Sequence, residues 1–444
     1  MELIKSISGI RGIFNKSLNI QNSTFFSKKF TLLQQDGPIL LARDTRPHGK
    51  QIYDNIIKSL NKIGRDVISC NIIPTPTAQY IIKQNNYAGG IVVTASHNPI
   101  EWNGLKFLDN DGCFLNERKM INVLDDNSIK EFSNHKGKTI NYDIAILEHI
   151  KNVENLKCIN TKKIKNKKFK IVVDTVNGAA YKALPLLLEK FNCEVVKIHC
   201  SNTGTFPRGT EPIPSHLKDL SHAVKIYQAD IGFATDPDAD RLAIVDNYAN
   251  PIGEESTLVL ALESYLKYYK NNQQVVTNLS TSMAIDFIAE KYGSKVKRSS
   301  VGEINVVEKM KKLDSKIGGE GNGGVILEES HLGRDSLVAA ALVLSHLAQS
   351  NTTLNNIIGK IPSLVMIKDK ITLQDDINFN HIKTFFQNEK VTYIENDGLK
   401  VIWEDKWIHI RKSNTEPIIR VISEACNHKL AKDLIDTFKK HISS

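Results

Sequence analysis

The sequence predicts an α/β protein of four domains around a central cleft: three similar mixed α/β domains, then a smaller α+β domain. Three observations lead to this fold class. The chain of 444 residues is too long for one hydrophobic core. A succession of strand, helix and strand recurs three times, as in βαβ units. Beyond about residue 365, short strands alternate with helices instead.

Each of the three repeats begins with an apolar strand and passes through a polar turn into an amphipathic helix. We expect strand, helix and strand at 39–44, 49–63 and 67–70, at 170–174, 178–191 and 195–198, and at 274–278, 282–291 and 295–299. An amphipathic helix at 428–441 closes the last domain. The expected domains, called I to IV below, are 1–142, 143–249, 250–363 and 364–444.

Composition and charge limit the classes of partner. Hydrophobic residues make up 41% and charged residues 24% of the chain, as in an ordinary globular protein. The formal net charge of +9 makes a nucleic-acid-binding protein an alternative that rests on charge alone. The basic residues are dispersed except at 161–170, which offers no aromatic stacking platform and precedes a strand. We therefore expect a solvated connector there, and no nucleic-acid partner.

The sequence also indicates a compartment. No apolar run approaches membrane-spanning length, and residues 1–14 lack the apolar centre of a signal peptide. The six cysteines are scattered, without a C-x-x-C pair or zinc-like spacing to histidines. Free, mostly buried thiols in a reducing compartment are the simple interpretation. We expect a cytoplasmic monomer or homodimer with no membrane partner.

The first candidate site is the segment 94–99, which directly follows the apolar run 91–93. Pro99 ends regular structure, so Ser96 and His97 would be presented on a tight turn. A serine at the end of a strand can be a rigidly held nucleophile. The alternative is a surface-loop serine beside a capping histidine.

A second candidate site is an acidic loop between two apolar strands. Asp236, Asp238 and Asp240 stand at alternate positions, where three carboxylates repel one another unless a cation neutralises them. Oxygen ligands favour Mg²⁺ over Ca²⁺ here. An EF-hand is excluded because its sixth and twelfth places hold Arg241 and Asn247. A solvated acidic turn is the alternative.

A third candidate site is the glycine-rich segment 318–324. Its glycines let another group pack against the backbone, while Glu320 and Asn322 project polar groups. A carboxylate and an amide suit hydrogen bonding to neighbouring sugar hydroxyls. A flexible loop is the alternative.

A fourth candidate site lies in the last domain and combines hydroxyls, an amide, backbone N–H groups and arginines. Such a set makes a nest for an anion, most simply a phosphate. A capped turn between two strands is the alternative. The residues are Arg411, Ser413, Asn414, Thr415 and Arg420.

Together these motifs resemble those of the α-D-phosphohexomutase family, and the resemblance covers essentially the whole chain. The segments TASHNP (94–99), DPDADR (236–241), GEGNGG (319–324) and RKSNTEP (411–417) occur in that family's order and approximate spacing. SGIRG (8–12), NGLK (103–106) and VGEINVVEKM (301–310) are also similar to family segments.

The resemblance implies roles for particular residues. Ser96 would be carried as phosphoserine, and its phosphate would bind one Mg²⁺ together with Asp236, Asp238 and Asp240. Cations around the transferring group would be Arg11, Lys106 and Arg241. The sugar would be read by Glu320 and Asn322, and the non-reacting phosphate by Arg411, Ser413, Asn414, Thr415 and Arg420.

The general base is a separate question. Many relatives have a histidine where this chain has Gly324, so no acid/base role can be carried over to that position. Lys106 and His97 are the candidates, and a partly desolvated Lys106 beside other cations is expected to have a lowered pKa.

The implied activity is that of an isomerase that moves phosphate between O6 and O1 of a hexose phosphate. A sugar bisphosphate would be the intermediate or activator. Overall similarity favours glucosamine 6-phosphate as substrate, and a phosphomannomutase/phosphoglucomutase is the close alternative. A metal-dependent sugar phosphatase and a non-catalytic sugar-phosphate sensor remain as rival functions.

Overall fold

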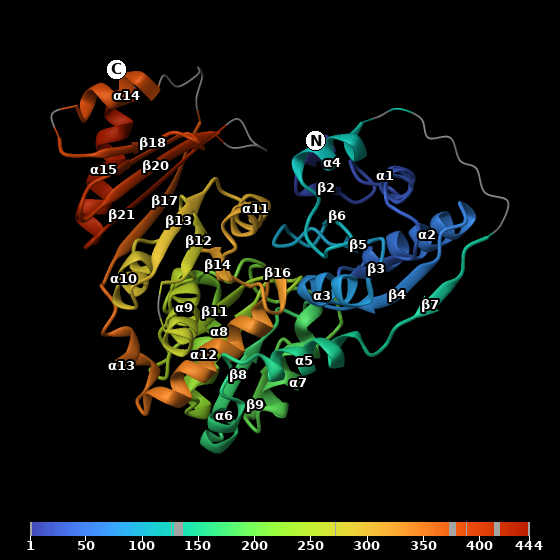
Figure 1. Cartoon of the computed structure of the whole chain (residues 1–444), viewed down its shortest axis with the longest axis horizontal. Helices are drawn as coiled ribbons and strands as arrows, with labels where there is room; N and C mark the ends of the chain where they lie inside the picture. The colour runs from blue at the N-terminus through green and yellow to red at the C-terminus, as the bar shows by residue number, and fades with distance from the viewer. Residues whose placement is uncertain are drawn as a thin grey trace.

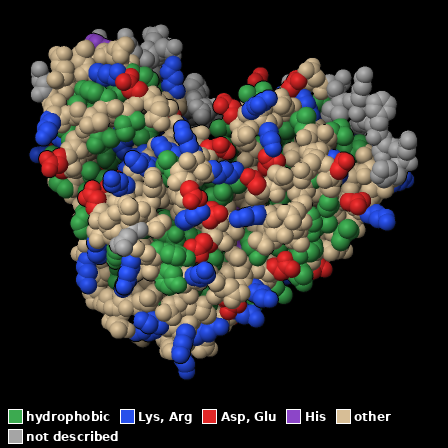
Figure 2. All heavy atoms as spheres, in the orientation of Figure 1, with side chains coloured by type: hydrophobic (Ala, Val, Ile, Leu, Met, Phe, Trp, Pro, Cys, Tyr) green, Lys and Arg blue, Asp and Glu red, His purple; other side chains and the backbone are tan. Residues whose placement is uncertain are grey.

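The chain is described by a computed structural model that covers residues 2–125, 127, 136–270, 272–372, 379–387, 389–412 and 418–442. Four sheets and their helices form a V-shaped molecule, with domain I and domain IV as its two upper lobes (Figure 1). The surface is hollowed between these lobes, and side chains of both charges lie around the floor of the hollow (Figure 2).

Domain I is built on a seven-stranded mixed sheet in the order β1-β2-β6-β5-β3-β4-β7. Its central strands are fully buried because helices cover both faces: Ile39 and Leu41 pack towards α1, α2 and α4, whereas Leu40 and Ala42 pack towards α3. The elements are β1 (Ile4–Ser6), β2 (Gly9–Ile13), α1 (Ile20–Leu33), β3 (Ile39–Arg43), α2 (Gly49–Lys62), β4 (Val67–Ile72), α3 (Thr75–Asn85), β5 (Gly89–Val93), β6 (Trp102–Leu108), α4 (Glu117–Leu124) and β7 (Thr139–Asn141).

Domain II has a four-stranded sheet in the order β11-β10-β8-β9. Only β10 and β11 pair antiparallel, so the loop that joins them, residues 236–241, lies at one end of the sheet. The elements are α5 (Ala145–Asn155), α6 (Thr161–Lys167), β8 (Lys170–Asp174), α7 (Ala183–Lys190), β9 (Glu194–Ile198), α8 (Lys218–Tyr227), β10 (Ile231–Thr235) and β11 (Leu242–Val245).

The expectation of a solvated connector at 161–170 is wrong. Helix α6 forms there, capped by Asn160, whose side chain accepts from the N–H of Lys163. Ile164 is fully buried and belongs to the largest hydrophobic cluster, and α6 packs against α12. The basic side chains therefore lie on the outer face of a packed helix.

Domain III has a five-stranded sheet in the order β13-β12-β14-β15-β16. Helix α12 is apolar on all sides and is buried from Ser336 to Ala348, as expected for a helix in the centre of a large protein. The elements are α9 (Glu255–Tyr269), β12 (Gln274–Asn278), α10 (Ala284–Lys291), β13 (Lys295–Ser299), α11 (Glu303–Leu313), β14 (Ile317–Glu320), β15 (Gly324–Leu327), β16 (His331–Arg334) and α12 (Ser336–Ser350).

Domains II and III share one hydrophobic core. A single cluster of buried residues runs from Ile150 to Ile357 and includes both sheets. Helix α12 is at its centre and contacts α5, α6 and α7 as well as α9 of its own domain. The acidic loop and the glycine-rich loop are therefore carried by one continuous packed body.

Domain IV is an antiparallel sheet in the order β17-β21-β20-β19-β18, with α15 packed on one face. Its core is separate from those of the other domains and includes Ile435 and Phe438 of α15. The elements, with the preceding α13, are α13 (Leu354–Ile358), β17 (Val365–Thr372), α14 (Phe379–Phe385), β18 (Thr392–Ile394), β19 (Leu399–Ile402), β20 (Trp407–Lys412), β21 (Ile418–Ala425) and α15 (His428–Ile442).

This architecture confirms the predicted fold class of mixed α/β domains followed by an α+β domain. All six cysteines are free thiols; Cys70, Cys113 and Cys158 are buried, whereas Cys426 is exposed. Within the described ranges, none of the helices combines the length and the apolar character needed to cross a bilayer.

Candidate active site

Ser96 lies on the turn between β5 and β6 and is 2% exposed. Its φ of 50° is in the left-handed region, which a residue with a Cβ adopts only when its surroundings enforce it. Arg46 supplies that enforcement: its Nη2 donates to the carbonyl oxygens of Ser96 and Asn98, each at 2.7 Å. The hydroxyl is therefore presented on a rigid turn, as the sequence predicts.

Two groups flank the hydroxyl. Oγ of Ser96 lies 3.3 Å from Nδ1 of His97 and 3.5 Å from Oδ2 of Asp236. Nη2 of Arg241 lies 3.1 Å from the same imidazole nitrogen. Arg241, burial and Arg11 together lower the pKa of His97 well below its usual value, so the imidazole is neutral at neutral pH.

The acidic loop brings its three carboxylates together in the interior. Asp236, Asp238 and Asp240 are each at most 1% exposed, and ligand oxygens of all three lie within 4.8 Å of one another. Burial, then Asp240 and Asp238, raises the pKa of Asp236 well above its usual value. Oδ1 of Asp238 and Oδ1 of Asp240 are buried and have no hydrogen-bond partner among the described residues. Unpartnered buried oxygens in a cluster of carboxylates fit a hard cation such as Mg²⁺.

Lys106 reaches this cluster from the first domain. Its Nζ lies 2.6 Å from Oδ2 of Asp238 and 3.2 Å from Oδ2 of Asp240. Although burial lowers the pKa of Lys106, the two carboxylates raise it by more. The expected lowered pKa is therefore wrong in this arrangement, because carboxylates rather than cations are the nearest neighbours of the ammonium group.

Arg11 also lies at the site because of strand pairing. In β2 it pairs with Gly104 of β6, two residues from Lys106, so the two cationic side chains start from neighbouring strands. Its Nη1 donates to Oδ1 of Asn98 at 3.2 Å. Burial is the main reason that the pKa of Arg11 is lowered from its usual value.

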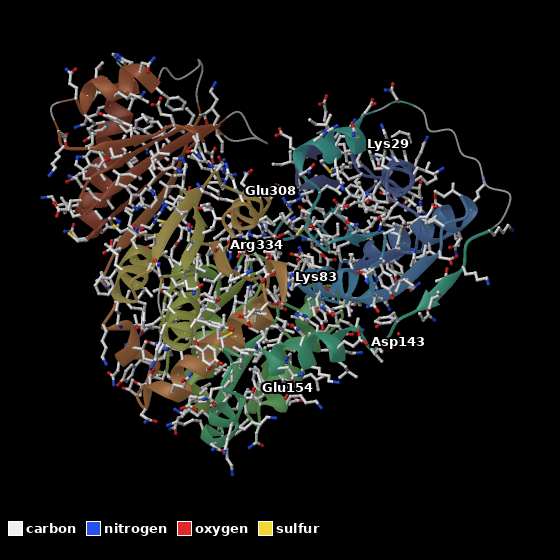
Figure 3. All side chains as sticks on the ribbon, in the orientation of Figure 1. Lys29, Lys83, Asp143, Glu154, Glu308 and Arg334 are labelled. Carbon is white, nitrogen blue, oxygen red and sulfur yellow. The ribbon has the colours of Figure 1, made fainter. Side chains whose placement is uncertain are left out.

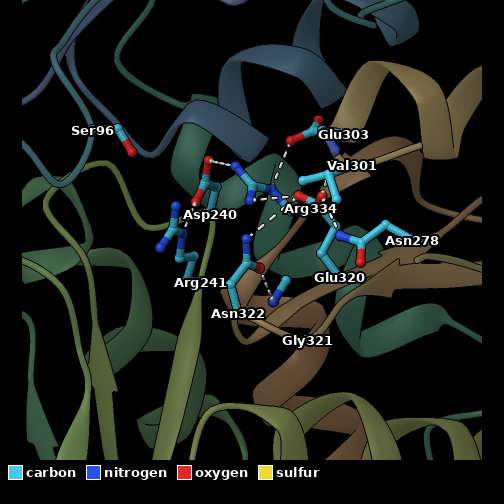
Figure 4. Close-up of polar contacts among 12 residues, drawn as sticks. Ser96, Asp240, Arg241, Asn278, Val301, Glu303, Glu320, Gly321, Asn322 and Arg334 are labelled. Atoms are coloured by element: carbon cyan, nitrogen blue, oxygen red, sulfur yellow. Dashed lines mark hydrogen bonds and ion pairs between the residues drawn. The ribbon is translucent and has the colours of Figure 1, made fainter. Parts of the chain in front are cut away.

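The glycine-rich segment forms the turn between β14 and β15, where Glu320 is 3% exposed. Its Oε1 accepts hydrogen bonds from Nδ2 of Asn278 at 2.7 Å and from the N–H of Gly302 at 2.9 Å. Its Oε2 accepts from Arg334 at 2.9 Å and from Asn322 at 3.4 Å (Figure 4). The two predicted sugar-reading side chains therefore meet, and the carboxylate is oriented by protein donors.

The fourth candidate site is described only in part. Arg411 of β20 and Arg420 of β21 stand directly opposite each other in the sheet. Nη1 of Arg411 lies 4.0 Å from Oδ1 of Asp397, and burial lowers the pKa of this arginine. The predicted contributions of Ser413, Asn414 and Thr415 fall outside the described residues.

Sequence reasoning missed three residues of the site. Arg46 holds the serine turn, and Arg334 and Glu303 stand between the acidic and glycine-rich loops (Figure 4). Burial raises the pKa of Glu303 to about 7, although Arg334 opposes this. A signal was present for Arg46, which stands in the polar segment RDTR (43–46) directly after the apolar stretch 39–42, whereas GRDS (333–336) follows a mostly polar segment and gave no such signal.

Comparison with known families covers the chain from end to end. Profiles of the phosphoglucomutase/phosphomannomutase family match it in order: α/β/α domain I at residues 3–150, domain II at 147–250, domain III at 253–364 and the C-terminal domain at 370–441. The chain belongs to the phosphoglucomutase/phosphomannomutase family. This membership confirms the resemblance to phosphohexomutases.

Similar proteins carry mutase names. A phosphoglucomutase/phosphomannomutase of Thermococcus kodakarensis is 34% identical over 440 residues, covering 96% of both chains. A phosphoglucosamine/phosphogalactosamine mutase of Sulfurisphaera tokodaii is 29% identical over 444 residues, covering 97% of both. A phosphoglucosamine mutase of Methanocaldococcus jannaschii is 31% identical over 419 residues, covering 90% of both. These names support the predicted enzyme class, an isomerase of the phosphohexomutase type.

Solved structures show the same fold. A phosphoglucomutase/phosphomannomutase family protein of Burkholderia thailandensis superposes with a TM-score of 0.84 at 23% identity, over 99% of this chain and 98% of that one. An N-acetylphosphoglucosamine mutase of Aspergillus fumigatus, in complex with GlcNAc-6P and magnesium, superposes with a TM-score of 0.58 at 13% identity, over 91% of this chain and 82% of that one.

Proposed function

We propose that this chain moves a phosphoryl group between O6 and O1 of a hexose phosphate, through phosphoserine at Ser96 and a sugar bisphosphate intermediate. The observation that carries the proposal is the meeting of the Ser96 hydroxyl with the acidic loop, 3.5 Å from Oδ2 of Asp236. These groups come from different domains and are 140 residues apart in the sequence.

The acidic loop would hold one Mg²⁺. Asp236, Asp238 and Asp240 would bind it together with an oxygen of the phosphate on Ser96. When bound, the ion would neutralise charge on the transferring phosphoryl group. The Oδ1 atoms of Asp238 and Asp240 support this assignment, since neither accepts a hydrogen bond from the described residues, although Oδ1 of Asp240 lies 3.7 Å from Nε of Arg241.

Cationic side chains of this chain would neutralise the remaining negative charge on the phosphoryl group. Phosphoryl transfer passes through a loose, highly charged arrangement, so position and electrostatics dominate. Arg11, Lys106 and Arg241 surround the serine turn and the acidic loop. As the phosphorus–Oγ bond of Ser96 breaks and a bond to the sugar oxygen forms, the sugar hydroxyl loses its proton to a base. Of the two candidates, His97 is neutral and can accept the proton, whereas Lys106, whose pKa the neighbouring carboxylates raise, already carries one.

Binding of the distal phosphate completes the scheme. Arg411 and Arg420 would grip whichever phosphate is not reacting, so that their binding energy serves both orientations of the bisphosphate. A last domain with its own core suits a motion that opens to let the intermediate turn and closes to exclude water.

Glucosamine 6-phosphate is the proposed substrate, converted to glucosamine 1-phosphate. Two similar proteins named for phosphoglucosamine support this choice. The 34% identical phosphoglucomutase/phosphomannomutase supports the second candidate, a mannose or glucose phosphate. Comparing kcat/KM for the three sugar phosphates decides between them, and the amino sugar should be preferred.

Ser96→Ala tests the central step. We expect the rate of isomerisation to fall at least about a thousandfold, because alanine lacks the hydroxyl that would carry the phosphoryl group. Intact-mass analysis and phosphopeptide mapping of active wild-type protein should place one phosphate on Ser96. Unchanged turnover in the variant would exclude the mechanism, whereas a wild-type protein that binds sugar phosphates without any turnover would favour the sensor hypothesis.

The phosphatase hypothesis has its own measurement. With glucose 1-phosphate as substrate, a mutase yields glucose 6-phosphate, whereas a phosphatase releases inorganic phosphate. Predominant release of free phosphate would favour the hydrolase. Tight, steeply salt-dependent binding of RNA or DNA would revive the nucleic-acid alternative.

A further inference from the structure

Arg334, the last residue of β16, connects the two loops on which the proposed reaction depends. It lies in the interior where domain III faces domain I (Figure 3) and is 8% exposed. Its three guanidinium nitrogens each bind a different carboxylate: Nε lies 2.8 Å from Glu303, Nη1 2.9 Å from Glu320 and Nη2 2.7 Å from Asp240 (Figure 4). One rigid, planar group therefore joins the acidic loop to the glycine-rich loop.

The stem of this arginine occupies the space beside Gly324. A Cβ at position 324 would lie 2.2 Å from Cδ and 2.8 Å from Cγ of Arg334. Gly324 does not have a positive φ, so its backbone does not demand glycine. Moving the stem aside is costly because three carboxylates hold its far end. Glycine is required here for space, because any larger residue at this position would meet the stem of Arg334.

The residues after Arg334 fix its backbone. Oδ2 of Asp335 lies 2.9 Å from Nε2 of His149 and 3.1 Å from Nε2 of His331, while Oδ1 accepts from the first N–H groups of α12. Oγ of Ser336 donates to the carbonyl oxygen of Ala239, inside the acidic loop, at 2.7 Å. The segment 334–336 is thus joined to the acidic loop by main chain and side chain.

We propose that Arg334 is a positioning residue that holds sugar-reading Glu320 in register with metal-loop Asp240, and that Gly324 is glycine to admit its side chain. The proposal rests on the proposed function, because the register matters only if a sugar on one loop meets a phosphoryl group at the other. A misplacement of about 1 Å between such groups can cost about a hundredfold in rate.

The Arg334→Lys variant tests whether Arg334 keeps Glu320 and Asp240 in fixed relative positions. Lysine keeps the charge but lacks the planar fork, so it cannot hold three carboxylates in fixed directions. We expect kcat/KM to fall about a hundredfold, with a rise in KM of about tenfold. Arg298→Lys is the matched control: this arginine of the same domain binds Asp286 with two nitrogens, and its variant should stay within threefold of wild type.

The KM separates positioning from a merely structural role. If Arg334 only maintained the fold, its variant would lower the fraction of active molecules and thus kcat, with KM unchanged. That result, or an Arg334→Lys variant within threefold of wild type, would overturn the proposal.

A second experiment needs no turnover. Gly324→Ala should lower the apparent Tm by several degrees in the wild-type background and by clearly less in an Arg334→Ala background, because the added Cβ then meets only Oδ1 of Asn322, at 3.0 Å. An equal loss in both backgrounds would overturn the pairing of Gly324 with Arg334. If wild type turned over none of the three sugar phosphates, the proposed function would fail, while this cycle would still decide the pairing.

Discussion

At the scale of single residues, Ser96 is one of several non-glycine residues with a left-handed φ, and it is the one that carries the proposed nucleophile. A left-handed φ of 50° on a buried residue with a Cβ is maintained by Arg46, which is itself fully buried and pairs with Asp44. The strain fixes the direction of the hydroxyl at the cost of stability. Ser96 should therefore lower the stability of the folded protein, whereas the proposed reaction requires its hydroxyl.

Ser96→Gly and Ser96→Ala should reveal this strain. Both variants lack the hydroxyl and should be inactive, but glycine accepts the left-handed conformation and should be about 1 kcal/mol more stable than alanine. Apparent Tm values from thermal unfolding give the comparison. Ser59, in the last turn of α2, is the control, since alanine should be the more stable residue at this helical position. Alanine more stable at both positions would contradict the expectation.

Sequence patterns singled out candidate residues where these are contiguous. The serine turn and the acidic loop each fit within six residues between apolar strands, so local pattern pointed to Ser96 and the three aspartates, which lie together in the structure. Arg46 and Arg334 act across 50 and 94 positions, at Ser96 and Asp240. Such contacts depend on the folded arrangement of sheets, which no local pattern contains.

At the scale of elements, polar contacts of the buried Glu263 join neighbouring helices of domain III. Glu263 of α9 lies 2.5 Å from Nζ of Lys291 in α10 and 3.3 Å from Nε2 of His346 in α12. Burial acts to raise the pKa of Glu263, but hydrogen bonds from His346 and Lys291 lower it to about 2. A carboxyl with a lowered folded-state pKa stabilises the protein above its unfolded pKa.

Glu263→Gln should therefore destabilise the protein in a pH-dependent way. At pH 7 we expect a loss on the order of 1 kcal/mol, because glutamine cannot carry the charge that pairs with Lys291 and water screens this pair at the half-exposed ammonium group. As the pH falls from about 4.5 towards 2, the wild-type carboxyl takes up its proton and the difference should shrink. Denaturant unfolding of both proteins at pH 7, 5 and 3 measures this difference in the free energy of unfolding. A gap that stays constant with pH would contradict the assignment.

The elements themselves were predictable where hydrophobic periodicity is strong. The strands at 39–43, 170–174 and 274–278 correspond to the predicted repeats. Helix α6 was missed because Ile164 is a lone apolar residue in a basic run, and its burial depends on α12, whose sequence lies far along the chain. Tertiary packing overrode local composition there.

At the scale of the whole molecule, the domains are joined in two different ways. Domains II and III share a hydrophobic core, whereas polar contacts join domain IV to domain III. Oδ2 of Asp397 accepts from the N–H of Val301 at 2.7 Å, and Nδ1 of His409 lies 2.9 Å from Oγ of Ser280. Val301 precedes Gly302, whose N–H binds Glu320, so this contact leads directly to the glycine-rich loop.

Asp397→Ala should loosen domain IV. Loss of the bond to Val301 favours more open arrangements, which should raise the radius of gyration in small-angle X-ray scattering and raise KM about tenfold, since Arg411 and Arg420 then reach the substrate less often. Asp433→Ala, at an exposed position of α15, is the control and should change neither value. An unchanged KM would show that this contact does not govern closure.

The polar character of this junction has a consequence for where the chain can be divided. Among the described residues, no hydrophobic cluster spans this boundary. The chain can therefore be divided there without creating a cavity or exposing a large apolar surface on either fragment. Chimaeras that graft another mutase's last domain after residue 364 should therefore fold, whereas chimaeras joined at residue 250 should fail.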